Sequence, residues 1–172
     1  VAEALGMSLT GCAVIPAPYR ERSQISFDTG KRIVEMVFED LTPSKIMTKK
    51  AFENAIVVAS AIGASSNCPP HLSAIAKHMG VKINLNDWQK LGHDIPLLVN
   101  CKPAGKHLME RFHRSGGIPA VMQELMKQKK LHTKVMTVSG KTLEQNLKIK
   151  LNIDKDVIKS FDNPVVDKAG FI

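Results

Sequence analysis

The chain has 172 residues, 44% hydrophobic and 23% charged, the balance of an ordinary globular domain that can bury a core. No apolar run reaches the ~18 residues that a membrane span needs, so we expect no membrane partner. The first residue is Val1 rather than methionine, and we expect an internal fragment of a longer protein.

The net charge of +8 comes from 24 Lys and Arg against 16 Asp and Glu. Residues 101–150 contain eleven Lys or Arg and three Glu and so carry the whole excess, because the other 122 residues are neutral. A basic segment is one signature of nucleic-acid or anion binding. The chain has only one Tyr and one Trp, too few to stack successive bases. We therefore expect a solvated basic surface rather than a nucleic-acid partner.

Three cysteines, Cys12, Cys68 and Cys101, lie far apart in the sequence. Their odd number and the lack of a Cys-x-x-Cys pair argue against a disulfide framework or a zinc knuckle. Three cysteines could ligate an iron–sulfur cluster, but their spacing favours buried structural thiols. Reduced thiols indicate a cytoplasmic protein.

The hydrophobic spacing predicts three helices in the first half of the chain, at about residues 23–40, 49–62 and 69–79. An irregular connection containing Pro16 and Pro18 precedes the first helix, because proline fixes φ and removes a donor. Thr48 is expected to cap the second helix, and Gly80 to end the third.

The second half predicts helices at about residues 86–92, 106–114, 119–130 and 143–150. Asn86 or Asp87 is expected to cap the first of them, and Pro119 to open the third. Thr142 and Gln145 have the spacing of a capping box for the last.

Three apolar segments between these helices are candidate strands: Val81–Leu85, Ile95–Val99 and Val135–Val138. The second, a continuous apolar run behind proline, is typical of a buried strand. After Ile153 the acidic and Asn-Pro-containing sequence predicts a linker over residues 154–172. The residues alone predict an α/β or mainly α class with few, short strands.

Common catalytic and metal motifs fail on spacing. Ser139–Thr142 resembles a phosphate-binding loop, but Val135 stands where that loop needs glycine. His71 and His78 are seven residues apart on one predicted helix, which is too far to share one metal without a third ligand. A Ser–His–Asp set can be assembled from Ser65, His93 and Asp94, yet no nucleophile elbow supports it.

Two glycine-containing segments precede predicted helices, Gly63–Asn67 and Ser115–Pro119. Free N–H groups and the positive end of the helix dipole make such a position suitable for an anion. An ordinary N-cap uses the same residue types. Both interpretations stay open on the residues alone.

Taken in order along the chain, five segments resemble the dihydroxy-acid dehydratase and phosphogluconate dehydratase family. These landmarks are Ala2–Gly11, Ala51–Ala55, Ala61–Asn67, His113–Gly117 and Gly140–Leu143. Pro16–Arg22, Gly92–Asn100 and Pro103–Gly105 resemble its sugar-acid branch, whose members dehydrate aldonates such as xylonate or arabinonate. The sequence departs from the family pattern at Ala64, Ser66, Lys106 and Ser115.

The resemblance implies a helix-rich part of a three-layer α/β/α N-terminal domain with few short parallel strands. Residues 1–153 would be the C-terminal portion of that domain, and 154–172 a linker towards a C-terminal β-barrel domain. The intact parent would carry an iron–sulfur cluster and Mg²⁺, whose ligand motifs do not match any position here, and would be a homo-oligomer. A chain cut from inside a domain should expose apolar faces, for which Ile33–Phe38 and Ile95–Val99 are the candidates.

The implied reaction is the dehydration of a sugar acid to a 2-keto-3-deoxy acid, in which a base takes the C2 proton and metal ions assist the departure of the C3 hydroxyl. We expect no catalytic or metal-binding residue in this chain, which alone should be inactive. Ser65, Ser66 and Asn67 are expected to bind substrate, because a sugar acid needs oriented donors for its carboxylate and hydroxyls. The alternatives are a branched-chain dihydroxy-acid or phosphogluconate dehydratase and a non-catalytic anion- or nucleic-acid-binding module.

Overall fold

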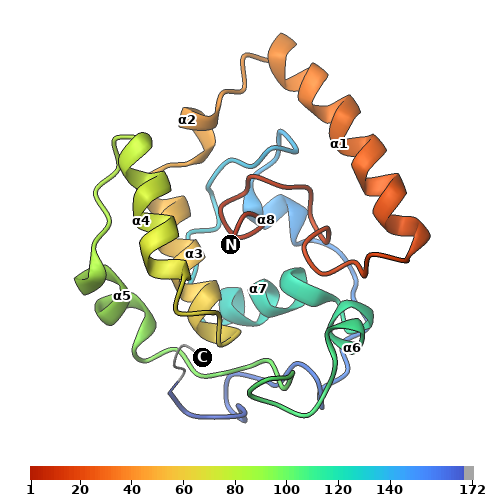
Figure 1. Cartoon of the computed structure of the whole chain (residues 1–172), viewed down its shortest axis with the longest axis vertical. Coiled ribbons are helices and arrows are strands. Elements are labelled where there is room, and N and C mark those ends of the chain that lie inside the picture. The colour runs from red at the N-terminus through yellow and green to blue at the C-terminus, as the bar shows by residue number, and fades with distance from the viewer. Residues whose placement is uncertain (169–172) are drawn as a thin grey trace.

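A computed structural model describes residues 1–168, and helices make up most of their regular structure (Figure 1). The helices, in chain order, are α1 (Arg20–Phe38), α2 (Pro43–Ile46), α3 (Lys49–Ala61), α4 (Cys68–His78), α5 (Leu85–Gly92), α6 (Met109–Arg114), α7 (Gly117–Lys127) and α8 (Leu143–Asn146). None of them is long and apolar enough to cross a membrane.

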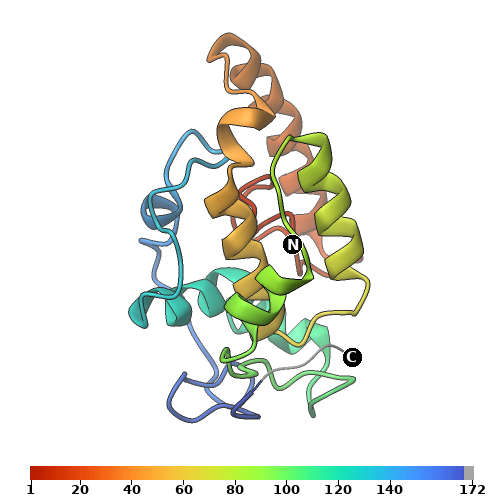
Figure 2. The same ribbon diagram turned by 90° about the vertical axis from the view of Figure 1, so that its left-hand side faces the viewer.

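Helix α3 forms the centre of the main core. Ten of its thirteen residues are buried, and it packs against α4, α5 and α7. Two views at right angles place α3 between α4 and α7, with α5 beside it (Figures 1 and 2). Gly92 allows the closest approach, because a Cβ at this position would lie 2.3 Å from the Ser60 hydroxyl oxygen of α3.

Helix α1 lies apart from this core, along the outer edge of the molecule (Figure 1). Only Met36 of its residues is buried, in a small second cluster with Ile46 and Val138. The Arg32 Nε donates to the Val138 carbonyl at 2.5 Å and ties the helix to the segment before α8.

Capping residues were partly predictable. Thr48 caps α3 by accepting from the Ala51 N–H, and Thr142 forms the predicted capping box with Gln145. The cap of α5 is Asn84, whose side chain accepts from Asp87 N, so the expected cap at Asn86 or Asp87 is wrong.

Several helix boundaries also differ from the predicted ones. Helix α6 begins at Met109 rather than near residue 106, and α7 begins two residues before Pro119. Helix α8 is a single turn that does not continue to Lys150.

The prediction of short parallel strands is wrong for the described residues, which contain isolated bridges and no strand. Residues 81–84 are irregular. In the segment 95–99, Leu97 and Val99 each form one antiparallel bridge, and the Leu98 N–H donates to the Ala61 carbonyl at the end of α3. Met136 forms a bridge with Thr142. A short apolar run fits a buried strand or a buried loop equally well. Here the runs at 95–99 and 135–138 form isolated bridges to single residues instead of a continuous ladder with a neighbouring strand.

The segment after Ile153 returns to the apolar run at 95–99. Val157 and Ile158 are buried, the Asn100 N–H donates to the Val157 carbonyl, and the Lys159 N–H donates to the Leu98 carbonyl. Residues 169–172 of the predicted 154–172 linker lie outside the described residues, and the linker assignment stays a prediction.

Candidate functional site

The turn between α3 and α4 has the geometry of a helix stop followed at once by a helix start. Gly63 adopts φ 61°, and the Ala64 N–H donates to the Ala59 carbonyl at 3.0 Å, which closes the end of α3. Ala64 itself is not in the left-handed region, so its methyl group introduces no strain. The departure from the family pattern at Ala64 therefore leaves this turn intact.

Ser65, Ser66 and Asn67 stand exposed at the start of α4, as the sequence predicted for their position. The Ser65 hydroxyl oxygen accepts from the Asn67 N–H at 3.2 Å and so shapes the turn. Asn67 occupies the N-cap position, but its side chain accepts from no backbone N–H of α4. The side chain of Asn67 thus lies at the positive end of an eleven-residue helix without acting as its cap.

The second glycine-containing helix start, at Ser115–Gly117, is closed by packing. Ser115 is buried, and Gly116 and Gly117 adopt φ 96° and 57°. A Cβ on Gly117 would lie 2.5 Å from the Cγ2 of Val14 in the N-terminal segment. The two glycine turns resemble each other in sequence, yet the side chains of the first face solvent and the second is a packing site.

A polar cleft of about 440 Å³ lies beside α6 and was not foreseen from the sequence. Arg111 pairs with Asp154 at 2.5 Å, and Arg114 pairs with Glu110 at 2.7 Å. The hydroxyl of Tyr19 donates to Glu110. This hydrogen bond, with the nearby Arg114 charge, holds the pKa of the Glu110 carboxyl below its usual value.

Each guanidinium of this cleft is already neutralised by a carboxylate, so its net charge is close to zero. The i,i+4 spacing of Glu110 and Arg114 was the one signal visible in the sequence, whereas Tyr19 lies 91 residues before Glu110.

The basic segment 101–150 spreads its charge over several elements. Four of its cations form ion pairs with carboxylates: Arg111, Arg114, Lys127 and Lys148. Exposed ion pairs of this kind contribute little to stability.

Comparison with known proteins identifies the family. Residues 1–146 match the dihydroxy-acid/6-phosphogluconate dehydratase N-terminal family. The chain belongs to this family. It is 54% identical over 172 residues to the D-xylonate dehydratase of Caulobacter vibrioides, covering all of this chain and 29% of that protein. It is 45% identical over 171 residues to the L-arabinonate dehydratase of Rhizobium leguminosarum bv. trifolii, covering 99% of this chain and 30% of the relative.

Dihydroxy-acid dehydratases match nearly as well. The enzyme of Acetivibrio thermocellus is 44% identical over 168 residues, covering 98% of this chain and 30% of its own length. The chain therefore spans less than a third of the length of each of these relatives.

The first family landmark meets the segment just before the last landmark, although about 130 residues separate them. The Val138 N–H donates to the Gly6 carbonyl at 2.8 Å. The buried Glu3 carboxylate accepts from the N–H groups of Gly11 at 2.6 Å and Ala13 at 3.0 Å, which fixes the first landmark as a loop. Burial raises the pKa of Glu3 above its ordinary value.

The sugar-acid landmarks also have packing roles. Asn100 is buried; its amide donates to the Asp156 carbonyl at 3.0 Å, and its side-chain oxygen accepts from the Lys106 N–H at 3.0 Å. Gly105 allows this loop to close, because a Cβ there would lie 2.3 Å from the Asn100 carbonyl carbon. Lys106 thus contributes its backbone to the loop.

The family implies an iron–sulfur cluster and Mg²⁺, and the described residues do not supply a site for either. Residues 1–168 contain no group of three or more His, Cys, Asp or Glu side chains that could hold a metal ion. Cys12 and Cys68 are half-buried, and Cys101 is buried, which raises the pKa of its thiol and disfavours the ligating thiolate.

Proposed function

We propose that this chain is part of a hydro-lyase that dehydrates a sugar acid, a 2,3-dihydroxy carboxylate, to a 2-keto-3-deoxy acid. The observation that carries the proposal is the 54% identity, over the whole chain, to a D-xylonate dehydratase. A proton leaves C2 and hydroxide leaves C3, so one water is lost, and the resulting enol becomes the ketone without any change of oxidation state overall. The metal groups and the base come from parts of the protein outside this chain, and the intact protein is a homo-oligomer.

In this proposal Ser65, Ser66 and Asn67 contact the substrate. A sugar acid presents a carboxylate and several hydroxyls, which need donors that are already oriented. Two hydroxyls and the Asn67 amide supply them without a mobile charged side chain. The expected free backbone N–H groups are not present at this helix start, because the Cys68 N–H donates to the Ser65 carbonyl and the next two residues are prolines. This role is supported by the exposure of all three side chains and by the side-chain amide of Asn67, which accepts from no N–H of α4.

A branched-chain dihydroxy-acid dehydratase is the second candidate. The 44% identity to the enzyme of Acetivibrio thermocellus favours it, since this value is almost that found for the L-arabinonate enzyme. The two substrates share the 2,3-dihydroxy carboxylate and differ in the group beyond C3.

A segment exchange separates the two. Residues 1–172 replace the matching segment of the Caulobacter D-xylonate dehydratase, and a control chimera receives the segment of the Acetivibrio enzyme instead. Both are purified anaerobically, checked for cluster absorbance, and assayed for 2-keto acid formation from D-xylonate, L-arabinonate and a branched dihydroxy acid. We expect sugar-acid turnover within about tenfold of the parent enzyme, or ~1.4 kcal/mol of transition-state stabilisation. A folded, cluster-loaded chimera that prefers the branched acid contradicts the proposal.

The same chimera tests the site. Asn67→Ala should lower kcat/KM by at least about tenfold, on the order of 1.4 kcal/mol. Asn86→Ala is the matched control, because Asn86 is also exposed in the first turn of a helix. Equal kinetics for the two variants would remove Asn67 from the site.

A further inference from the structure

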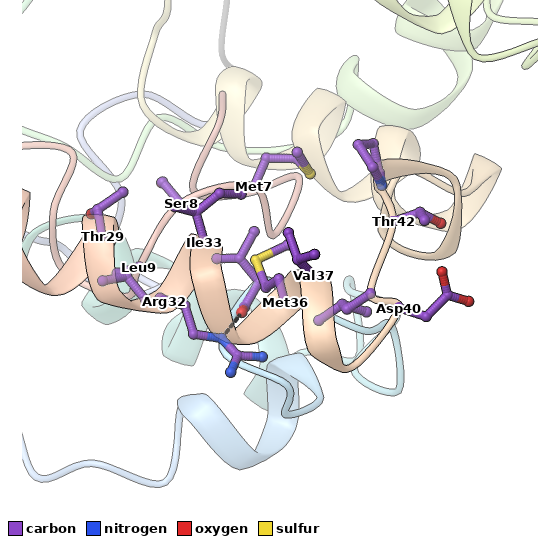
Figure 3. Close-up of a pocket in the computed structure, with 13 residues that line it drawn as sticks. Met7, Ser8, Leu9, Thr29, Arg32, Ile33, Met36, Val37, Asp40 and Thr42 are labelled. Carbon is purple, nitrogen blue, oxygen red and sulfur yellow. Dashed lines mark hydrogen bonds between the residues drawn. The ribbon is translucent and has the colours of Figure 1, made fainter.

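Two cavities of similar size differ in their chemistry. The cavity of about 450 Å³ between α1 and the N-terminal segment is apolar, with Ile33 and Val37 of the helix and Met7 and Leu9 of the segment in its wall (Figure 3). Apolar walls attract any apolar partner without regard to direction, so they do not specify one. The cleft of about 440 Å³ beside α6, here called the α6 cleft, is lined by polar residues instead. A polar lining selects its ligand through the direction of its hydrogen bonds.

The least exposed residue of the α6 cleft is Ser115. It is 3% exposed, whereas the side chains of the four charged residues in the lining are 38–66% exposed. The Ser115 hydroxyl makes no hydrogen bond within residues 1–168. A buried polar group without a partner is unfavourable, and native proteins contain few of them. This hydroxyl therefore points to a hydrogen-bonding group that residues 1–168 do not supply.

The walls of the cleft leave both donors and acceptors unused. Arg111 bonds to Asp154 through Nη2 alone, and Arg114 bonds through Nε and Nη2, so both Nη1 groups keep their N–H donors. On the acceptor side, the Oε2 of Glu110 and the side-chain amide of Asn152 have no partner within the described residues. The two pairs of opposite charge leave the lining with no net charge.

A neutral polyol is the ligand class that matches this lining. Each of its hydroxyls donates one hydrogen bond and accepts up to two, so it uses guanidinium donors and a carboxylate acceptor together. A free anion gains little here, because the carboxylates repel it while the guanidiniums attract it. An apolar ligand would cover the charged groups without pairing them. The volume of about 440 Å³ lies within the ~300–1,000 Å³ of small-molecule pockets.

We propose that the α6 cleft binds a polyhydroxylated small molecule, a sugar or sugar alcohol, whose neighbouring hydroxyls bond to Ser115 at the floor and to Arg111 and Glu110 at the walls. The proposal does not rest on the dehydratase reaction. A chimera without activity leaves it standing, and a cleft that binds no polyol leaves the proposed function standing.

The test is an NMR titration of the ¹⁵N-labelled 172-residue chain with xylitol, a neutral polyol, up to about 100 mM. We expect saturable shifts of the amide signals of Ser115 and Asn152, with a dissociation constant of about 1–10 mM, the affinity of a few hydrogen bonds made in water. D-Xylonate should bind within about threefold of xylitol, since its carboxylate gains little in a lining without net charge. Inorganic phosphate at the same ionic strength should leave these signals unchanged.

Ser115→Ala should raise the dissociation constant for xylitol at least about fivefold, because one hydrogen bond to the ligand is lost. Ser60→Ala is the matched control: Ser60 is also a buried serine, but it lies on α3 with its hydroxyl bonded to the Ile56 carbonyl, so xylitol binding should not change. Arg111→Lys keeps the positive charge opposite Asp154 and removes the guanidinium fork, so it should also weaken xylitol binding.

Folding provides an independent readout. The urea midpoint of Ser115→Ala should not fall below that of the unmodified chain, since the hydroxyl has no partner in residues 1–168 to lose. A lower midpoint would indicate an internal partner for this hydroxyl and would remove the basis of the proposal.

The longer protein decides whether the cleft stays open. In the chimera that carries residues 1–172 in the Caulobacter enzyme, saturation-transfer NMR should give a xylitol signal that Ser115→Ala reduces. Equal signals for the two proteins would mean that another segment fills the cleft, and would overturn the proposal. It is also overturned if xylitol gives no saturable shift, if Ser115→Ala leaves the affinity unchanged, or if phosphate binds in place of xylitol.

Discussion

Replacing Gly117 by alanine tests whether the closed helix start at α7 is required by the fold. Gly117 adopts φ 57°, a left-handed conformation that disfavours a side chain by about 1–2 kcal/mol. The added Cβ would also lie 2.5 Å from the Cγ2 of Val14, well inside the ~3.5–4.0 Å of a good carbon–carbon contact. Val14 is β-branched and stiff, so the backbone must move, which typically costs about 1–3 kcal/mol. The sum is about 2–5 kcal/mol of unfolding free energy.

Gly80→Ala is the matched control. Gly80 has φ 70° and open space around its Cβ position, so this variant introduces the backbone strain without the clash. It should lose only about 1–2 kcal/mol. The excess for Gly117→Ala, about 1–3 kcal/mol, isolates the contact with Val14.

Urea denaturation followed by circular dichroism and by Trp88 fluorescence measures these differences, with coincident transitions as the check for two-state behaviour. In a Val14→Ala background the Cγ2 is gone and the remaining Val14 Cβ position is 4.0 Å from the new Cβ, an ordinary contact. Gly117→Ala should then be no worse than Gly80→Ala. The reasoning is refuted if Gly117→Ala costs no more than Gly80→Ala, or if the Val14 and Gly117 substitutions add without coupling.

Two further predictions concern buried polar groups. Asn54→Ala should destabilise the chain by about 1–3 kcal/mol in urea denaturation, because the Asn54 amide pairs with both the N–H and the carbonyl of His132, at 2.8 and 3.0 Å. The exposed control Asn86→Ala should change the free energy of unfolding by less than about 0.5 kcal/mol, and equal effects of the two variants would contradict the argument. Burial raises the pKa of Glu3 above 4.5, so the folded state resists its ionisation and stability falls as pH rises through that raised pKa. The free energy of unfolding of the chain, relative to that of Glu3→Gln, should therefore decrease from about pH 4.5 upward, by at most about 1.4 kcal/mol per pH unit. A difference that increases with pH would contradict this argument.

Local rules predicted the caps well and the strands poorly, for a physical reason. Thr48 and Thr142 bond to backbone within three residues, so their partners are fixed by the sequence itself. At α5 the spacing of Asn84 and Asp87 also had this signature, but neighbouring Asn86 offered a competing start. A strand needs a partner elsewhere in the chain, and periodicity does not identify one.

Of the two apolar segments expected to be exposed, one is exposed and the other is buried. Ile33–Phe38 is largely exposed, as predicted for that segment, whereas Ile95–Val99 is buried and that part of the prediction is wrong. The second segment found its cover in the end of α3 and in residues 157–166, which no local pattern linked to it. Helix α1 found no such cover within residues 1–168, because only its Met36 side reaches another cluster.

The helix start that carries the candidate site followed from a local sequence signal alone. Gly63, two serines and an asparagine before two prolines predict a helix start, and α4 begins there. The Tyr19–Glu110–Arg114 cluster joins two distant segments, so it was beyond the reach of spacing arguments.

The exposed position of Asn67 gives one more test, which separates binding from folding. In the 172-residue chain its side chain caps no N–H of α4 and is open to solvent, so Asn67→Ala should change the free energy of unfolding by less than about 0.5 kcal/mol. An N-cap role would instead cost about 1 kcal/mol. Thr48→Ala in α3 is the positive control, because Thr48 does accept from the Ala51 N–H at 3.4 Å. A neutral Asn67→Ala makes any loss of kcat/KM in the chimera a direct effect on substrate, since the folded population is unchanged. A loss of stability equal to that of Thr48→Ala would return Asn67 to an ordinary cap.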